Sequence, residues 1–355
     1  MNTIAVHDSS NIKIKALSAE NIEAWDNYVN QHKDASVYHL SPWLKLIQRT
    51  FSHDCYYFLA IDNENKICGV LPSVNLRSRL FGNFIVSMPY FNYGGVLADN
   101  NDIAIALNEH LQKIAEELNV SHIQYRELDE RDNCKLAVSQ SKVNMILQLP
   151  ESPEALGKLI GSKRRSQIKR PIKEGVSHKL GSTELLDDFY QVFCENMRDL
   201  GTPVYSKSFF QNILETFKSN ASICIIYWQG KPVSGGFLIR YKDRLEIPWA
   251  STLSYANRIS VNMYLYWQIL SYAIETGCKE FDFGRSTIDE GTYRFKKQWK
   301  SEPQQCYWYH WVPDGEELPD LSPKNSKFNL AIKLWKKLPL PVANTLGPFL
   351  VKNLP

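Results

Sequence analysis

The chain has 355 residues, of which 44% are hydrophobic and 22% charged, with a formal net charge of +3, so it is long enough to bury the cores of two ordinary domains. No apolar run approaches the ~20 residues of a membrane span and the N-terminus lacks a secretory signal, which predicts a cytoplasmic protein. The seven cysteines form no CxxC pair and the eight histidines are scattered, so the sequence predicts no metal site and no disulfide framework.

The positive charges are concentrated in two segments. Residues 163–173 carry six basic side chains and no acidic one, and residues 324–355 carry six lysines and no acidic one. The remainder of the chain is therefore acidic. This distribution favours local contacts with phosphate groups or an anionic membrane surface over general nucleic-acid binding.

The first half of the chain contains signals for both helices and strands. Ser18 is expected to cap one helix, and Ser41 a second helix that begins with Pro42. A long helix is expected to open at Asn101 or Asp102, because apolar residues follow it on one helical stripe. Apolar and alternating runs predict strands at 55–61, 67–71, 84–88 and 122–126.

The second half repeats this order of elements. Helices are predicted after Thr183 and Ser206, and Asn262 is expected to cap a further helix that ends at Gly277. A hairpin is expected to turn at Gln229 and Gly230. The predicted strands of this half are 222–228, 233–241, 244–249 and a short half-buried strand at 280–283.

Short matches between the halves indicate an internal duplication. Residues 66–69 resemble 231–235, and residues 123–125 resemble 281–283, at offsets of 165 and 158 residues. Two similar sets of helices and strands predict an α+β fold present twice. We therefore expect a first domain at 1–148, a second domain at 149–322 and a basic amphipathic tail at 323–355.

Six segments of the chain together resemble one known family, namely PYFNYGGVL, SKRRSQIKRPIKEGV, LGTPVYSKSFF, NMYLYWQIL, FDFGRS and GTYRFKKQW. The chain resembles the FemAB-like branch of the GNAT N-acyltransferase superfamily, and within it the proteins that accompany exosortase and exopolysaccharide gene systems in Gram-negative bacteria. The resemblance implies two tandem GNAT-like domains and an enzyme that joins an aminoacyl or other acyl group to an amine on a cell-envelope or exopolysaccharide precursor.

The acyl donor stays open between aminoacyl-tRNA and acyl-CoA, and no tightly bound cofactor is expected. Well-studied relatives use aminoacyl-tRNA with a saccharide or peptidoglycan-like acceptor, whereas others in the broader group are acetyltransferases. A CoA site needs a glycine-rich turn for the pyrophosphate, and residues 257–261 contain no glycine, which counts against CoA. The alternatives are an acetyl-CoA-dependent amino-sugar acetyltransferase and a non-catalytic saccharide-binding module.

The resemblance also assigns roles near the end of the second domain. Relatives carry a Phe-Lys pair there, and Phe295-Lys296 stands in the matching place, with the lysine supporting acyl transfer and the aromatic ring near the tRNA end. An amine that attacks an ester generates an oxyanion, which a positioned cation stabilises. Asp282 is expected to orient the amine or take its proton, and Arg285 to hold a phosphate. Solvent exposure of Asp282, or an ion pair with Arg285, is the alternative.

Further candidates would line the substrate site. Tyr293 and Trp299 are interleaved with cations near Lys296, a pattern that suits a planar or anionic ligand. Asn262 is a candidate for donor binding because a helix N-terminus attracts anions. The last candidates for substrate contacts are Tyr93, Arg198 and Tyr205. For these residues and for Asn262, the alternative is packing, surface charge or ordinary helix capping.

The two basic segments carry separate expectations. Pro171 is expected to interrupt the helix in 163–173 and to leave a short helix at 163–170 with a kinked exit. In the tail, lysines surround an apolar stripe, which is typical of an interfacial helix. The tail therefore predicts contact with the anionic surface of the inner membrane, with packing against the second domain as the alternative. The stripe consists of Phe328, Ile332, Trp335 and Leu338.

Overall fold

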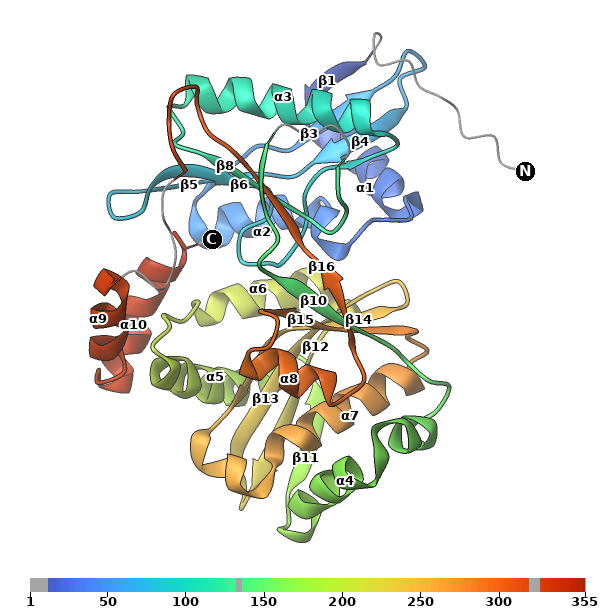
Figure 1. Cartoon of the computed structure of the whole chain (residues 1–355), viewed down its shortest axis with the longest axis vertical. Coiled ribbons are helices and arrows are strands. Elements are labelled where there is room, and N and C mark those ends of the chain that lie inside the picture. The colour runs from blue at the N-terminus through green and yellow to red at the C-terminus, as the bar shows by residue number, and fades with distance from the viewer. Residues whose placement is uncertain (1–11, 132–135, 319–325, 355) are drawn as a thin grey trace. The chain divides into compact units, whose positions relative to one another are not determined.

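The computed structural model describes residues 12–131, 136–318 and 326–354, and they form two compact units (Figure 1). The first unit comprises Met1–Lys142, Gln305–Pro319 and Asn353–Pro355, and the second comprises Val143–Gln304 and Asp320–Lys352. These bounds differ from the predicted domains at both ends of the second unit. Residues 143–148 join the second unit, and the aromatic run at 307–311 returns to the first.

The first unit contains two sheets and the helices α1 (Ile22–Gln31), α2 (Pro42–Phe51) and α3 (Asn101–Glu117). One sheet has four strands in the order β1-β3-β4-β7, and the other has six in the order β2-β5-β6-β8-β17-β9. The strand predicted at 55–61 is split between the two sheets, and five strands have no counterpart among the predicted ones, namely β1, β5, β7, β9 and β17. The strands are β1 (Lys13–Ala16), β2 (Asp54–Cys55), β3 (Phe58–Ile61), β4 (Ile67–Leu71), β5 (Val74–Ser78), β6 (Gly82–Val86), β7 (Leu97–Ala98), β8 (Ile123–Glu127), β9 (Ala137–Ser139) and β17 (Tyr307–Trp311).

The second unit is built on one seven-stranded sheet in the order β11-β12-β13-β14-β15-β10-β16. Its strands are β10 (Val143–Gln148), β11 (Ser177–Gly181), β12 (Ala221–Trp228), β13 (Lys231–Tyr241), β14 (Arg244–Thr252), β15 (Glu280–Ser286) and β16 (Glu302–Gln305). Its helices are α4 (Pro153–Lys173), α5 (Leu186–Leu200), α6 (Lys207–Phe217), α7 (Val261–Glu275), α8 (Gly291–Lys297), α9 (Ser326–Trp335) and α10 (Leu340–Val351).

Both units contain the same strand pattern around one parallel pair. In the second unit β14 and β15 run parallel and are joined by α7, and in the first unit β6 and β8 run parallel and are joined by α3. Parallel neighbours need such a crossover helix. An antiparallel strand from a distant part of the chain then flanks each pair, β10 beside β15 and β17 beside β8. This shared topology supports the predicted duplication.

The helix starts agree with the prediction only in part. Helix α3 begins at Asn101, as predicted, and the side chain of the preceding Asn100 caps it by accepting a hydrogen bond from the Ile103 amide. Ser41 precedes α2, but its hydroxyl donates to Asp26 Oδ2 at 2.7 Å and caps nothing. Ser206 caps α6 as predicted, accepting from the Phe209 amide. The sequence thus locates the helices well and their first residues less well, because serine and asparagine have other partners available in the fold.

Helix α4 continues through Pro171 and bends instead at Gly161. The backbone of Gly161 has φ +82° and ψ 171°, outside the helical region, a conformation that glycine adopts without a steric penalty. Pro171 lies in the last turn and is buried, so its missing N–H and its ring affect only the end of the helix. The predicted break at residue 170 is therefore wrong, and the six basic residues of 163–173 lie on one continuous helix.

The tail helices pack against the second unit near the C-terminal end of α5. Gly347 of α10 approaches the backbone of Val204 so closely that an added Cβ would lie 2.8 Å from the Val204 nitrogen. Gly201, which ends α5 with φ +83°, is similarly close to Ile332 of α9. Packing of the tail, one of the two predicted alternatives, is thus observed. Within the described residues, no helix combines the length and apolar character needed to cross a membrane.

Candidate active site

A bulge in β15 forms the centre of the candidate site. Ile146 of β10 pairs with Asp282 and Asn144 with Arg285, so β15 has one residue more than β10 over this interval. Gly284 within the bulge has φ +74°, a left-handed conformation that suits glycine. Bulges of this type change the direction in which neighbouring side chains and carbonyls point, and they are frequent beside active sites.

Lys296 of α8 binds the carbonyl groups that the bulge presents. Its Nζ donates to Gly284 O at 2.9 Å and to Arg285 O at 2.8 Å. An ammonium group has three N–H donors, so one donor remains for a substrate oxygen. The side chain is buried, with 8% of its surface exposed, and the local polarity therefore comes from fixed protein groups rather than from bulk water.

Asp282 lies on the same bulge and is fully buried. Its Oδ1 accepts a hydrogen bond from the Gly284 amide at 2.6 Å, and its Oδ2 accepts from Asn144 Nδ2 at 3.4 Å. The predicted half-buried alternation over 280–283 is wrong, because the whole run from Phe281 to Gly284 is buried. The solvent-exposed alternative for Asp282 is also excluded, whereas Arg285 is exposed.

Burial gives Lys296 a pKa suited to chemistry near neutral pH. Desolvation lowers the pKa of the Lys296 ammonium from its ordinary value of 10.5 to about 8, the nearby charge of Asp282 raises it, and Arg285 lowers it. Below pH 8 the side chain is mainly the cation, and above pH 8 it is mainly the neutral amine. A group with this pKa can both stabilise negative charge and give up a proton at neutral pH.

The sequence analysis missed two polar residues beside Asp282. Glu246 of β14 stands in parallel register with Asp282 and is buried, with 3% of its surface exposed. Residues in register on neighbouring strands project to the same face of a sheet, so a second carboxyl lies beside Asp282. Asn144 of β10 is fully buried as well. A glutamate inside the otherwise apolar run 245–250 is the signal that could have identified Glu246.

Replacing Gly284 by alanine is expected to destabilise the protein by about 1–2 kcal/mol, because an alanine at φ +74° is strained. The substitution would also misdirect the two carbonyls that bind Lys296. Gly291→Ala is the matched control, since Gly291 has no positive φ and space for a methyl group. Urea unfolding of both variants measures the difference. Equal midpoints for the two variants would contradict a special role for Gly284.

The aromatic candidates near Lys296 are mainly part of the core of the second unit. Trp299 is fully buried, and its indole nitrogen has no hydrogen-bond partner among the described residues. Phe295 is half-buried, with its ring centroid 5.1 Å from that of Tyr266. Tyr293 is half-buried against the same core. Phe295 and Tyr293 thus remain partly exposed, whereas Trp299 is part of the core.

The structure gives the remaining candidates contacts within their own units. Tyr93 belongs to the first unit, where it is buried. Its ring centroid lies 5.3 Å from that of Tyr38. Arg198 donates to Leu338 O at 3.1 Å and pairs with Asp199, so it secures the tail. The packing alternative therefore describes the environment of Tyr93, whereas Arg198, for which the alternative was a surface charge, binds the tail. Tyr205 likewise packs against aromatic rings of its own unit.

Asn262 does not cap α7, contrary to the prediction. The helix begins at Val261, and Ser260 is the N-cap residue, in the left-handed conformation with φ +62°. Asn262 lies in the first turn, and its Oδ1 accepts from the Met263 amide at 2.9 Å. The left-handed residue at 260 shifts the start of the helix, which the sequence did not indicate because serine rarely adopts this conformation.

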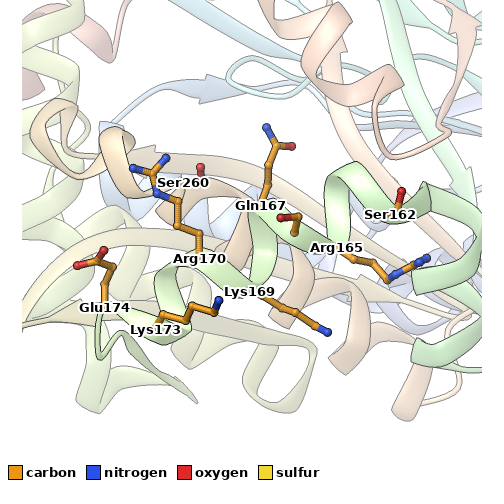
Figure 2. Close-up of a pocket in the computed structure, with 9 residues that line it drawn as sticks. Ser162, Arg165, Gln167, Lys169, Arg170, Lys173, Glu174 and Ser260 are labelled. Carbon is orange, nitrogen blue, oxygen red and sulfur yellow. The ribbon is translucent and has the colours of Figure 1, made fainter.

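A basic groove lies between the second part of α4 and the start of α7 (Figure 2). Its volume is about 670 Å³, and Arg165, Lys169, Arg170 and Lys173 contribute the positive charge. In Figure 2 the Arg170 side chain extends from α4 in the direction of Ser260. Arg165 also donates to Gly157 O at 2.7 Å. Among the described residues that line the groove, Glu174 alone is acidic, so the groove suits an anion.

The duplicated topology, with a parallel strand pair and crossover helix in each unit, defines a tandem GNAT-fold protein. Residues 162–297 match the family described as "Acetyltransferase (GNAT) domain", and this segment contains the β15 bulge, Lys296 and the basic part of α4. The chain therefore contains a GNAT acyltransferase domain, as the resemblance implied.

A curated relative is of the Fem type. The UDP-N-acetylmuramoylpentapeptide-lysine N(6)-alanyltransferase of Weissella viridescens is 26% identical over 167 residues, which cover 45% of this chain and 49% of the relative. The chain thus matches about half the length of this relative. The relative's name describes alanyl transfer to the N6 amine of a lysine in UDP-N-acetylmuramoylpentapeptide.

Solved structures confirm the fold over most of the chain. FemX has a TM-score of 0.64 at 14% identity, covering 84% of this chain and 97% of FemX. A tandem GNAT protein from the clavulanic acid biosynthesis pathway has a TM-score of 0.57 at 9% identity, covering 86% of this chain and 100% of that protein. The C-terminal domain of a putative lysylphosphatidylglycerol synthetase from Agrobacterium fabrum has a TM-score of 0.55 at 14% identity, covering 84% and 93%.

Proposed function

We propose that this protein is an aminoacyltransferase that joins the aminoacyl group of an aminoacyl-tRNA to an amine on a cell-envelope or exopolysaccharide precursor. The observation that carries the proposal is Lys296, a buried cation with a pKa of about 8, held by the β15 bulge beside Asp282. This arrangement lies within a GNAT domain. Both proposed substrates suit a reaction in the cytoplasm.

The proposed reaction requires charge stabilisation and proton transfer but no covalent enzyme intermediate. The acceptor amine attacks the ester carbonyl, a C–N bond forms, and the C–O bond to the terminal ribose breaks. The third N–H of Lys296 stabilises the oxyanion or protonates the departing ribose oxygen. Asp282 or Glu246 accepts the proton that the amine loses, and Arg285, which is exposed next to the bulge, binds a phosphate.

The basic groove on α4 supports a donor that carries phosphates. Its four cationic side chains give the groove a positive charge, which suits a donor that carries several phosphate groups better than a neutral acyl group alone. The rings of Phe295 and Tyr293, which are partly exposed, are candidates for stacking with a terminal base. The identity of the donor and the binding of its phosphates in this groove are two proposals, and each has its own test.

An acetyl-CoA-dependent amino-sugar acetyltransferase is the second candidate. The match to the acetyltransferase (GNAT) domain family favours it. Ser260 also favours it. A phosphate-binding turn commonly uses glycine to adopt a left-handed backbone, and Ser260 has this conformation at the start of α7.

The proposal for the acceptor rests on the lysine amine that the name of the Weissella viridescens relative specifies.

Titration of the purified protein at fixed salt tests the donor. Aminoacyl-tRNA is compared with uncharged tRNA and acetyl-CoA, since phosphate contacts make each affinity depend on ionic strength. A preference for charged tRNA is expected. A preference for acetyl-CoA would replace the donor in the proposal, and binding of none of the three would favour a saccharide-binding module.

Replacing Arg170 and Lys173 together by glutamine is expected to weaken tRNA binding by at least about tenfold and to reduce the slope of log affinity against log salt by about 2. Exposed lysines on other surfaces provide the control, Lys113→Gln with Lys231→Gln. Fluorescence titration over a range of salt concentrations measures both quantities. The same loss in the control variant, or no loss in the groove variant, would contradict a donor site on α4.

A further inference from the structure

The tail helices expose a second apolar face that the sequence stripe did not include. Leu330 and Leu334 of α9 are 62% and 60% exposed, and Leu346 of α10 is 46% exposed. Scattered exposed leucines are common on protein surfaces, but a group on two adjoining helices is not. Val342 and Phe349, at 41% and 67% exposure, extend the group on α10.

The opposite faces of these helices are already occupied. Ile332 contacts Gly201, Gly347 contacts Val204, and Arg198 binds the carbonyl of Leu338 between the two helices. Ile332 belongs to the apolar stripe predicted to contact a membrane, and it faces α5 instead. The outward leucines therefore contribute little to holding the tail in place, and their exposure calls for an external contact.

Lysines accompany the outward leucines on α9. Leu330, Lys333, Leu334 and Lys337 follow at spacings of three, one and three residues, which places them on one side of the helix and the turn that follows it. Lys333 and Lys337 are exposed. Residues 326–354 contain no acidic side chain. The outer face of the tail thus combines apolar side chains with positive charge.

We infer that this outer face binds an anionic lipid surface. Leucine and phenylalanine side chains enter the boundary between headgroups and acyl chains, while the lysines remain with the anionic headgroups. Helices of 10 and 12 residues lie along such a surface, since a span needs ~20 residues. A second copy of the chain fits less well, because its lysines would meet like charges, and protein interfaces are depleted in lysine.

Flotation of the full-length protein with lipid vesicles tests this inference without any assumption about the reaction. The probes are vesicles of phosphatidylcholine with phosphatidylglycerol and vesicles of phosphatidylcholine alone. We expect binding to the anionic vesicles that weakens as salt is raised. Leu334→Ser with Leu346→Ser is expected to reduce this binding by at least about tenfold, and Lys333→Gln with Lys337→Gln is expected to remove its salt dependence.

The controls separate lipid binding from general loss of structure. Leu80→Ser removes a leucine that is 70% exposed in the first unit, and it should leave vesicle binding unchanged. Circular dichroism melting of each variant shows whether it is folded. The inference fails if the wild type binds neither vesicle or if the tail variants bind as tightly as the wild type. It also fails if the wild type is a dimer that the leucine variant converts to a monomer without any effect of lipid.

Discussion

Replacing Lys296 by methionine is expected to reduce kcat by about 10²–10³-fold while donor and acceptor still bind, because the substitution removes the cation that stabilises the oxyanion. Methionine has a similar length and can occupy the same buried space. The carbonyls of Gly284 and Arg285, which accept from Lys296 at 2.9 and 2.8 Å, would lose this donor. The measurement is single-turnover transfer together with a separate binding titration.

The neighbouring residue offers a matched control for this variant. Lys297 forms a surface ion pair with Glu302 at 2.8 Å and does not contact the bulge. Lys297→Met should therefore retain nearly full transfer activity, since surface ion pairs contribute little to stability. Full activity of Lys296→Met would show that the assigned role is wrong, and equal loss in both variants would point to a general disturbance of α8.

Replacing Asp282 by asparagine is expected to lower the rate by about 10²-fold and to move the pH dependence. In the wild type, the rate should fall as pH rises through about 8, because Lys296 then loses the proton that makes it a cation. The Asp282 carboxylate raises the pKa of Lys296. Removing that negative charge lowers this pKa, so the fall in rate should begin at lower pH in the variant.

Rate measurements from pH 6 to about 9.5 test this shift. This range spans the reduced pKa of Lys296 and part of the interval up to its ordinary value. Asp243→Asn serves as the control because Asp243 is exposed and pairs with Lys279 at 3.7 Å. Its profile should match that of the wild type. An unchanged alkaline limb in Asp282→Asn would contradict electrostatic coupling between Asp282 and Lys296, even if the overall rate were reduced.

The duplicated α+β fold could be predicted because its signals are local. Apolar stripes identified α3, α5 and α6, and turn residues identified the hairpin of β12 and β13. The assignment of β10 to the sheet of the second unit and of β17 to a sheet of the first unit could not be predicted in this way. The pairing of β10 with β15 joins residues about 140 positions apart in the sequence, and short apolar segments do not specify such distant partners.

The candidate site was predicted by residue type but not by geometry. The Phe-Lys pair singled out Lys296, but the bulge whose carbonyls bind its Nζ was not predicted, and the alternation at 280–283 left an exposed Asp282 as an alternative. Its burial follows from the strands on both sides, which contribute Asn144 and Glu246. Trp299, by contrast, looked like a ligand contact because cations surround it in the sequence, yet its side chain enters the core.

The most direct test of the account is transfer of a labelled aminoacyl group from tRNA to a precursor that carries a lysine amine. The assay follows the label with wild-type protein and with Lys296→Met under single-turnover conditions. The account predicts that the label leaves the tRNA and appears in an amide on the precursor, and that the variant binds both substrates without transfer. Label that stays on the tRNA while acetyl-CoA acetylates the same amine would contradict it.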